Sequence, residues 1–373
     1  MSIRMNVRDF ALKRLTGLLV APTAAEVQVP GASQLLIGTH DGSFHCDEAM
    51  ACGLLRHTEQ FAQANVVRTR VPAQHALCNI VVDVGSVYDA SRNLLDHHQP
   101  EFQEKMHTGR HQYNTRLSSA GLVYRHFGTE IVSSYAEACV AAGALTTKPS
   151  EEQLRLVYDK VYKGFMEHVD GIDNGVEEFS AAEEGGKVVR NYTVSSTLSA
   201  RVGQLYPRWN QASSRQDEDR GFVAAVELTV VEFFEALDYY LCSWLPARAL
   251  VEEAFSSAAV VHESQQIVVL SASGCPWKEH LLDIEKESNC EGRTLYVLYS
   301  DGKGWRVQCV PKGNSSFLNR KPLPWKGLRD DELSKASGID GGVFVHASGF
   351  IGGNKTFEGA KAMAIKALSL EAQ

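Results

Sequence analysis

The chain is predicted to fold as an α/β protein, with a mostly parallel sheet that carries helices on both faces, followed by a smaller α/β domain. Short apolar runs alternate with stretches of helical spacing from residue 34 to 175. Such alternation is typical of a parallel sheet. A second set of strand-like runs begins near residue 262 and closes with a helix. A length of 373 residues also favours two domains.

The first half of the chain supplies the elements of the larger domain. Strands are expected where short runs rich in valine, isoleucine and leucine are bounded by polar or glycine residues. These runs are QLLIGTH (34–40), NVVRTRV (65–71), NIVVDVG (79–85) and RNLLDHH (92–98). Helical spacing of apolar residues predicts helices over 47–61, 118–128, 133–145 and 151–175.

The second half begins with polar stretches at 181–187 and 210–221, which are expected to be loops. An apolar helical segment follows over 222–257, with a break expected at Pro246. Strands are then expected at 266–272, 294–300 and 305–311, before a strand, a glycine-rich loop and a helix within 341–368. The expected organisation is an N-terminal extension (1–33), a first domain (34–205), a helical linker (206–261) and a C-terminal domain (262–373), with the boundary near 205–220.

Composition narrows the function. The formal charge of −8, from 45 acidic and 37 basic residues, argues against coating duplex nucleic acid by bulk charge, but it allows a local basic groove. No stretch approaches the ~18–20 apolar residues that cross a bilayer, so no membrane partner is expected. Eight scattered cysteines without a CxxC pair argue against structural zinc and favour a reducing compartment.

The first twenty residues are basic and amphipathic. Arg4, Arg8, Lys13 and Arg14 lie among apolar positions, and Asp9 is the one acid. This composition is typical of a mitochondrial presequence, and an ordinary basic tail is the alternative.

The segment THDGSFHCDE follows the first predicted strand and carries candidate metal ligands. His45 and Asp47 are two residues apart, so they point the same way in extended backbone. His40 reaches the same centre if the loop containing Gly42 folds back. Imidazole with carboxylate suits manganese, iron, cobalt or zinc, whereas carboxylate with water suits magnesium. The alternative is a helix-start loop, with Asp47 at the positive end of the helix.

Further candidates end the neighbouring strands. Asp83 ends one apolar run, and the triplet Asp96, His97 and His98 ends another. Ligands bind beyond the carboxyl ends of the strands in such sheets, so these side chains are expected to converge. His97 and His98 point to opposite sides in extended backbone, which leaves one for metal and one for substrate. A turn-forming aspartate is the alternative for Asp83.

The turn HVDGIDNG supplies a last carboxylate, from Asp170 or Asp173. Several carboxylates around two metal ions would bridge them and generate a hydroxide at neutral pH. The predicted chemistry is metal-assisted hydrolysis of a phosphoester.

The C-terminal segment contains a candidate anion clamp. Gly349, Gly352 and Gly353 would let the backbone approach a phosphate, while His346 and Lys355 would contact it. A glycine-rich turn without a ligand is the alternative. A basic stretch interleaved with aromatics precedes it and would suit single-stranded nucleic acid, although solvated surface charge is the commoner explanation. It comprises Lys303, Arg306, Lys312, Arg320, Lys321, Lys326 and Arg329, with Trp305, Phe317 and Trp325.

Taken together, six segments resemble successive blocks of the melanocyte-proliferating-gene (MYG) family. They are GTHDGSFHCDEAMA, VVDVGSVYD, LDHHQPEF, LSSAGLVYRHFG, GIDNGV and FVHASGFIGGNKT. That family is a branch of the DHH phosphoesterase superfamily, which also includes RecJ exonucleases and family II inorganic pyrophosphatases. The resemblance runs from about residue 34 to the C-terminus.

The resemblance implies a DHH-type catalytic domain joined by a helical linker to a substrate-binding C-terminal domain, with the active site in the cleft between them. It implies a 3′–5′ exonuclease on single-stranded RNA, placed in the mitochondrion or nucleus. The alternatives are a phosphoesterase acting on a short oligonucleotide, dinucleotide or pyrophosphate, and a non-catalytic RNA-binding protein.

Site roles also follow from the resemblance. Two divalent ions, with Mn²⁺ favoured and Mg²⁺ as the alternative, would be held by His40, His45, Asp47, Asp83, His97 and an aspartate of the GIDNG block, preferably Asp173. The catalytic triplet would be Asp96, His97 and His98. Substrate would contact His98, Ser119, His346, Gly349, Gly352, Gly353 and Lys355.

Overall fold

The computed structural model describes residues 6–27, 34–176, 197–209, 212–313, 316 and 318–370. The predicted loop 181–187, the first two residues of the loop 210–221 and Phe317 therefore lie outside the described residues. The chain divides into two compact units, Met1–Cys242 and Ser243–Gln373. Among the described helices, none has the length and apolar character that a membrane crossing requires.

The first unit is built on a mostly parallel sheet of six strands in the order β1-β3-β2-β4-β6-β5. The first five strands of this order run parallel, and β5 pairs antiparallel with β6. The central strands are fully buried, which is why they read as continuous apolar runs in the sequence. The strands are β1 (Val20–Ala21), β2 (Leu36–Thr39), β3 (Asn65–Arg68), β4 (Ile80–Val82), β5 (Tyr88–Asp89) and β6 (Leu94–Leu95).

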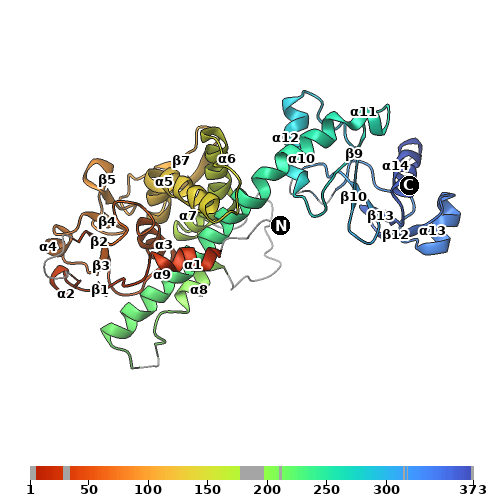
Figure 1. Cartoon of the computed structure of the whole chain (residues 1–373). Coiled ribbons are helices and arrows are strands. Elements are labelled where there is room, and N and C mark those ends of the chain that lie inside the picture. Colours follow the sequence, from red (N-terminus) through yellow and green to blue (C-terminus); the bar gives the residue numbers. More distant parts are fainter. Residues whose placement is uncertain are drawn as a thin grey trace. The chain divides into compact units, whose positions relative to one another are not determined.

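Helices cover both faces of this sheet, as the sequence predicts (Figure 1). α2 and α4 lie on one side, and α3, α5 and α9 lie on the other. A hairpin of β7 (Lys105–His107) and β8 (Gln112–Arg116) precedes α5. The helical elements are α1 (Val7–Lys13), α2 (Ala24–Val27), α3 (Cys46–Leu55), α4 (Pro72–His75), η1 (Ala90–Arg92), α5 (Ser119–Ala141), α6 (Glu151–Val161), η2 (Tyr162–Met166), α7 (Glu167–Asp173), α8 (Leu198–Gly203) and α9 (Arg215–Asp238).

Three sequence predictions about helices need correction. The loop expected over 210–221 is helical from Arg215, where α9 begins. The helices expected at 118–128 and 133–145 are one continuous helix, α5, because no residue between them interrupts the apolar face that ends at Cys139. The helix expected over 151–175 contains a π turn, η2, and ends at Asp173. Gly164 in this turn leaves room for Tyr240, since a Cβ there would lie 2.2 Å from the Tyr240 hydroxyl.

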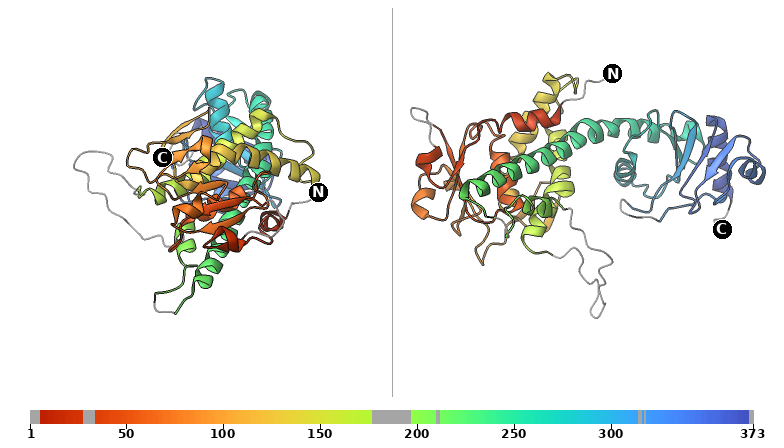
Figure 2. Two further views of the ribbon diagram at one scale, coloured as in Figure 1. Left: turned by 90° about the vertical axis from the view of Figure 1, so that its left-hand side faces the viewer. Right: turned by 90° about the horizontal axis from the view of Figure 1, so that it is seen from below.

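Helix α1 and strand β1 are packed into the first unit. Phe10 of α1 makes edge-to-face ring contacts with Tyr135 and Phe234, and β1 extends the sheet beside β3. Helix α9, the long green helix in Figure 2, packs against both α1 and α3. A Cβ at Gly53 of α3 would lie 2.0 Å from the Val230 methyl group on α9, so glycine permits this close approach. Because α9 belongs to the first unit, the division falls later than the 205–220 expected.

The second unit is a five-stranded sheet in the order β12-β13-β11-β10-β9. Strands β9 and β10 are parallel and the other pairs are antiparallel. α14 packs with the cluster that contains Met363 and Tyr296, and α10 and α12 pack with the cluster that contains Val251 and Leu281. The elements are α10 (Leu245–Ser256), α11 (Ala258–Val261), β9 (Ile267–Val269), α12 (Trp277–Glu287), β10 (Tyr296–Ser300), β11 (Trp305–Cys309), α13 (Asp330–Ser337), β12 (Gly342–Val345), β13 (Ile351–Asn354) and α14 (Phe357–Ser369), preceded by the π turn η3 (Tyr239–Trp244).

The break expected at Pro246 is present: the π turn η3 interrupts the helical segment up to Trp244, and Pro246 lies in the first turn of α10, where its missing N–H costs no helical hydrogen bond. One detail of the C-terminal prediction is wrong. Gly352 and Gly353 are not in a loop, since both belong to β13. A Cβ at Gly353 would meet the Arg306 guanidinium at 2.6 Å, so packing inside the sheet explains this glycine.

Candidate metal centre

Three neighbouring parallel strands end in polar side chains at one edge of the first sheet. His40 follows β2, Asp83 follows β4 and Asp96 follows β6, and these strands are adjacent in the sheet. Asp83 has φ +58°, in the left-handed region, where aspartate is tolerated better than most residues. The backbone therefore turns sharply at Asp83. The strand-end convergence expected from the sequence is present.

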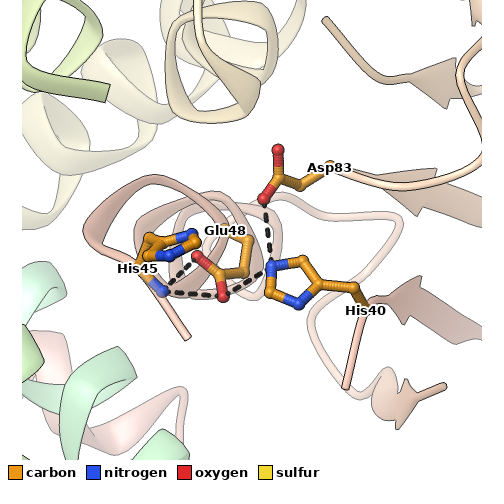
Figure 3. A group of neighbouring side chains, drawn as sticks. All are labelled: His40, His45, Glu48 and Asp83. Carbon is orange, nitrogen blue, oxygen red and sulfur yellow. Dashed lines mark hydrogen bonds and ion pairs between the residues drawn. The ribbon is translucent and has the colours of Figure 1, made fainter. Parts of the chain in front are cut away.

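His40 is buried and belongs to the group of side chains shown in Figure 3. Its Nε2 lies 3.1 Å from Glu48 Oε1 and 3.3 Å from Asp83 Oδ2. Its Nδ1 faces the Asp41 carbonyl at 3.0 Å. Burial lowers the pKa of His40, but the hydrogen bonds to Asp83 and Glu48 outweigh it and raise the pKa to about 10. His45 completes a set of four ligand atoms that all lie within 4.8 Å of one another.

Glu48 is a site residue that the sequence analysis missed. It is fully buried, and both of its carboxylate oxygens accept from the His45 backbone N–H at 2.9 Å. His45 is the N-cap of α3 and Glu48 occupies the N3 position, so this contact is half of a capping box. The signal was present in the sequence, because an acid three residues after a helix-start residue points back to it.

A second group surrounds His97. Its Nε2 lies 3.1 Å from Asp83 Oδ1, 3.2 Å from Asp173 Oδ2 and 3.9 Å from Asp47 Oδ2. Ligand atoms of His45, Asp47 and Asp173 also lie within 4.8 Å of one another, as do those of Asp83, His97 and His98. These groups overlap, because His45 and Asp83 each belong to two of them.

The carboxylates in this centre fit a bound cation. Asp47 is fully buried, and its Oδ2 accepts from the Ser119 N–H at 3.2 Å and the Ser119 hydroxyl at 2.8 Å. Its Oδ1 is buried without a hydrogen-bond partner. Burial and the charges of Asp83 and Asp173 raise the pKa of Asp47 well above its ordinary value. A divalent ion would satisfy the orphan oxygen and relieve this repulsion. Ser119, which the resemblance assigns to substrate binding, donates both of these hydrogen bonds to Asp47.

Asp170 and Asp173 have different surroundings. Asp170 is fully buried: Oδ1 accepts from the Ser118 N–H at 3.0 Å and the Ser118 hydroxyl at 2.7 Å, and Oδ2 accepts from the Tyr162 hydroxyl at 2.8 Å. Burial is the main cause that raises the pKa of Asp170 to about 7. Asp173 lies beside His97 and lines a pocket of the first unit that also includes His97 and His98. The geometry therefore favours Asp173 as the ligand.

Asp96 makes hydrogen bonds that orient the other two residues of the triplet. It accepts from the backbone N–H of Ser86 at 2.5 Å and of His97 at 2.8 Å, and its Oδ1 lies 2.7 Å from His98 Nδ1. Burial opposes ionisation of Asp96, but the His98 and Ser86 hydrogen bonds outweigh it and lower its pKa. The His98 side chain is 58% exposed, whereas His97 is buried. One imidazole thus faces the acids and the other remains open to solvent.

A pocket of about 550 Å³ opens beside these groups within the first unit. It is lined by Phe44, His45, Cys46, His97, His98, Gln99, Pro100, Arg116, Ile172, Asp173, Asn174, Ser199 and Gly203. Its lining therefore includes the exposed histidine of the triplet and Asp173. Its size is within the ~300–1,000 Å³ typical of small-molecule sites.

The C-terminal candidates lie in the second unit. His346 is exposed, with Nδ1 3.0 Å from the Ser348 hydroxyl, and Lys355 is exposed just after β13. Gly349 has φ +75°, and a Cβ there would meet the Leu323 carbonyl oxygen at 2.8 Å, so this turn requires glycine. Gly352 and Gly353 are buried in the sheet.

Several residues of the basic stretch make contacts within the second unit. Arg320 pairs with the buried Glu285 at 2.7 Å, and Lys321 Nζ donates to the Leu368 carbonyl at 2.7 Å. Trp325 is buried in the core and Trp305 packs on Phe357 with ring centroids 4.7 Å apart. These two tryptophans are therefore engaged within the unit, not presented as base-stacking surfaces.

The fold and the candidate centre are those of an α/β protein whose carboxylates and imidazoles are arranged to suit divalent metal ions. The chain belongs to the MYG1 family, since residues 36–368 match the family model MYG1_exonuc, described as an uncharacterised protein family (UPF0160). The resemblance to the MYG family is thereby confirmed.

Relatives carry a name that bears on activity. MYG1 exonuclease of Bos taurus is 48% identical over 334 residues, which cover 88% of this chain and 83% of that protein. MYG1 exonuclease of Homo sapiens is 47% identical, covering 88% and 84%. A solved structure of RecJ from Thermus thermophilus with Mn²⁺ is 13% identical with a TM-score of 0.22, covering 100% of this chain and 56% of that one. Family membership and the candidate centre support a metal-dependent exonuclease or phosphoesterase.

Proposed function

We propose that this protein is a metal-dependent 3′–5′ exonuclease that releases nucleoside monophosphates from single-stranded RNA. The observation that carries the proposal is the sharing of Asp83 and His45 between overlapping ligand groups. Shared ligands suit two ions held ~3.5–4 Å apart, the spacing of two-metal phosphoesterases. The RNA substrate, the polarity and a mitochondrial or nuclear location rest on the family resemblance, as does assignment to the DHH type.

Most of the site residues would hold the two metal ions, and His98 would contact the substrate phosphate. Imidazole mixed with carboxylate suits Mn²⁺, with Mg²⁺ as the alternative. Ions so held lower the pKa of a bound water and offset the charge that develops on the phosphate. His98, oriented by Asp96, has an exposed ring that can donate to a phosphate oxygen. The ions would be held by His40, His45, Asp47, Glu48, Asp83, His97 and Asp173.

The pocket supports action at a chain end. About 550 Å³ has room for a nucleotide and little more of a chain, which suits release of single nucleotides. The same size favours one second candidate, a phosphoesterase acting on a dinucleotide, a short oligonucleotide or pyrophosphate. The substrate-binding roles expected of His346 and Lys355, which lie in the second unit, rest on the resemblance.

The test is hydrolysis of a 5′-labelled single-stranded RNA in Mn²⁺, Mg²⁺ or EDTA, beside a DNA strand of the same sequence. His97→Ala serves as the inactive control, with circular dichroism to verify its fold. A metal-dependent ladder that shortens from the 3′ end supports the proposal. Shortening from the 5′ end, or internal cuts, would contradict the polarity or the mode. Cleavage confined to strands of a few nucleotides would favour the second candidate.

A further inference from the structure

The pocket beside the candidate metal centre contains one strongly basic side chain. Arg116, at the end of β8, is the sole lysine or arginine among its described lining residues. The same lining contributes Asp173 and three histidines, among them His97 and His98. A permanent cation thus lies in a pocket whose other ionisable groups suit metal ions.

The backbone at Arg116 is held in place on two sides. Arg116 pairs with Lys105 across the β7–β8 hairpin. Asn174, the residue after Asp173, donates from Nδ2 to the Arg116 carbonyl at 3.0 Å and to the Asp170 carbonyl at 2.9 Å. One amide side chain therefore ties the end of β8 to the end of α7, which carries Asp173.

The guanidinium of Arg116, by contrast, is uncommitted. Within the described part of the chain it makes no ion pair and no hydrogen bond, although Asp173 lines the same pocket. Some other arginines of this unit are paired, such as Arg68 with Asp219 at 3.3 Å and Arg125 with Glu104 at 2.5 Å. Arg116 is half-buried. A fixed backbone with an unpaired planar cation at its end is an arrangement suited to an incoming anion.

We propose that Arg116 is a phosphate-binding residue that grips the nonbridging oxygens of a nucleotide phosphate in this pocket. This inference rests on the proposed function and deepens it. A phosphate drawn only by metal ions is held by point charges, whereas a guanidinium fork adds two directed N–H donors. Arg116 would therefore act mainly on substrate binding and leave metal binding unchanged.

The experiment titrates adenosine 5′-monophosphate, the expected product class, onto the Mn²⁺-loaded full chain by calorimetry. The proteins are wild type, Arg116→Ala, Arg116→Lys and Arg110→Ala. Arg110 is the matched control, an exposed arginine in the turn of the same hairpin and outside the pocket lining. KM and kcat for single-stranded RNA, manganese content and thermal midpoint are measured on each.

Loss of a charge-assisted hydrogen-bond pair should weaken monophosphate binding by roughly 10- to 100-fold in Arg116→Ala. KM should rise by more than kcat falls, Arg116→Lys should recover part of the affinity, and Arg110→Ala should match wild type. Manganese content and thermal midpoint should not move. A dissociation constant for Arg116→Ala within twofold of wild type would overturn the inference. Loss of manganese in both Arg116 variants would also overturn it, by assigning Arg116 to support of the metal centre.

The two proposals fail separately. If wild-type protein leaves RNA intact but monophosphate binding still requires Arg116, the phosphate site stands and the nuclease proposal falls. If RNA is shortened and Arg116→Ala equals wild type in both KM and monophosphate affinity, the nuclease proposal stands and the role of Arg116 falls.

Discussion

Asp170→Asn should change how the stability of the protein depends on pH. Burial is the main cause that raises the pKa of Asp170 from 3.8 to about 7 in the folded state. The folded protein therefore keeps this proton while the unfolded chain loses it. The contribution of Asp170 to the free energy of unfolding is greatest below pH 3.8, falls as pH rises through that window, and is constant above about pH 7. Asparagine does not titrate, so the variant lacks this loss.

The expected magnitude follows from the size of the shift. Each pKa unit is worth ~1.4 kcal/mol, so the full window amounts to on the order of 4 kcal/mol. Between pH 5 and pH 8, ionisation of Asp170 lowers the free energy of unfolding of the wild-type protein by on the order of 3 kcal/mol. The free energy of unfolding of Asp170→Asn, minus that of wild type, should rise by this amount across that range.

Urea unfolding of both proteins at intervals between pH 5 and pH 8, in chelator, measures this difference. Titration of all other groups is common to both proteins and cancels. A difference that stays flat with pH would show that Asp170 is ionised throughout, with the hydrogen bonds from Ser118 and Tyr162 outweighing burial. Manganese content, measured in parallel, should be unchanged by Asp170→Asn.

Three further outcomes are expected. Asp173→Asn should lower manganese affinity by more than roughly 100-fold, since even outer-sphere changes cost ~10–100-fold; full manganese content by mass spectrometry would exclude Asp173 as a ligand. Asp96→Asn should keep its manganese but lower kcat on RNA by roughly 10- to 100-fold, because the exposed imidazole loses its orienting carboxylate; an unchanged kcat would remove that role. Gly121→Ala should destabilise the fold by about 1–3 kcal/mol in urea unfolding, since its Cβ would lie 2.4 Å from the Asp170 carboxylate. Gly203→Ala, with nothing within 4 Å, is the matched control, and equal effects would contradict the packing argument.

The strand ends could be predicted because their signal is local. Continuous apolar runs identify buried parallel strands, and a polar residue directly after each run must lie at the carboxyl edge. His40, Asp83 and Asp96 follow from this rule alone. The role of Glu48 did not, because the sequence indicates its contact with the start of α3, whereas its approach to His40 depends on how α3 packs against the sheet.

The choice between Asp170 and Asp173 could not be made from sequence, for a physical reason. Both acids lie on the same helix, α7, and the difference comes from side chains outside that helix, Ser118 and Tyr162, that hydrogen-bond to the Asp170 carboxylate. The position of Gly353 in a strand could not be predicted either, because the glycine-rich sequence around it suggested a loop. Its place in β13 is set by pairing with the neighbouring strand β11, where Gly353 lies opposite Arg306.

Glu48 has a consequence for anyone who wishes to alter the metal preference of this protein. Its carboxylate accepts from the His45 N–H at the start of α3 and also touches the imidazole of His40. In the proposed metal centre, one side chain therefore both holds a metal ion and caps the start of α3. A substitution chosen to favour a harder or softer ion would also fray the first turn of α3, so the two properties cannot be tuned independently. Any redesign has to begin by giving that turn another cap.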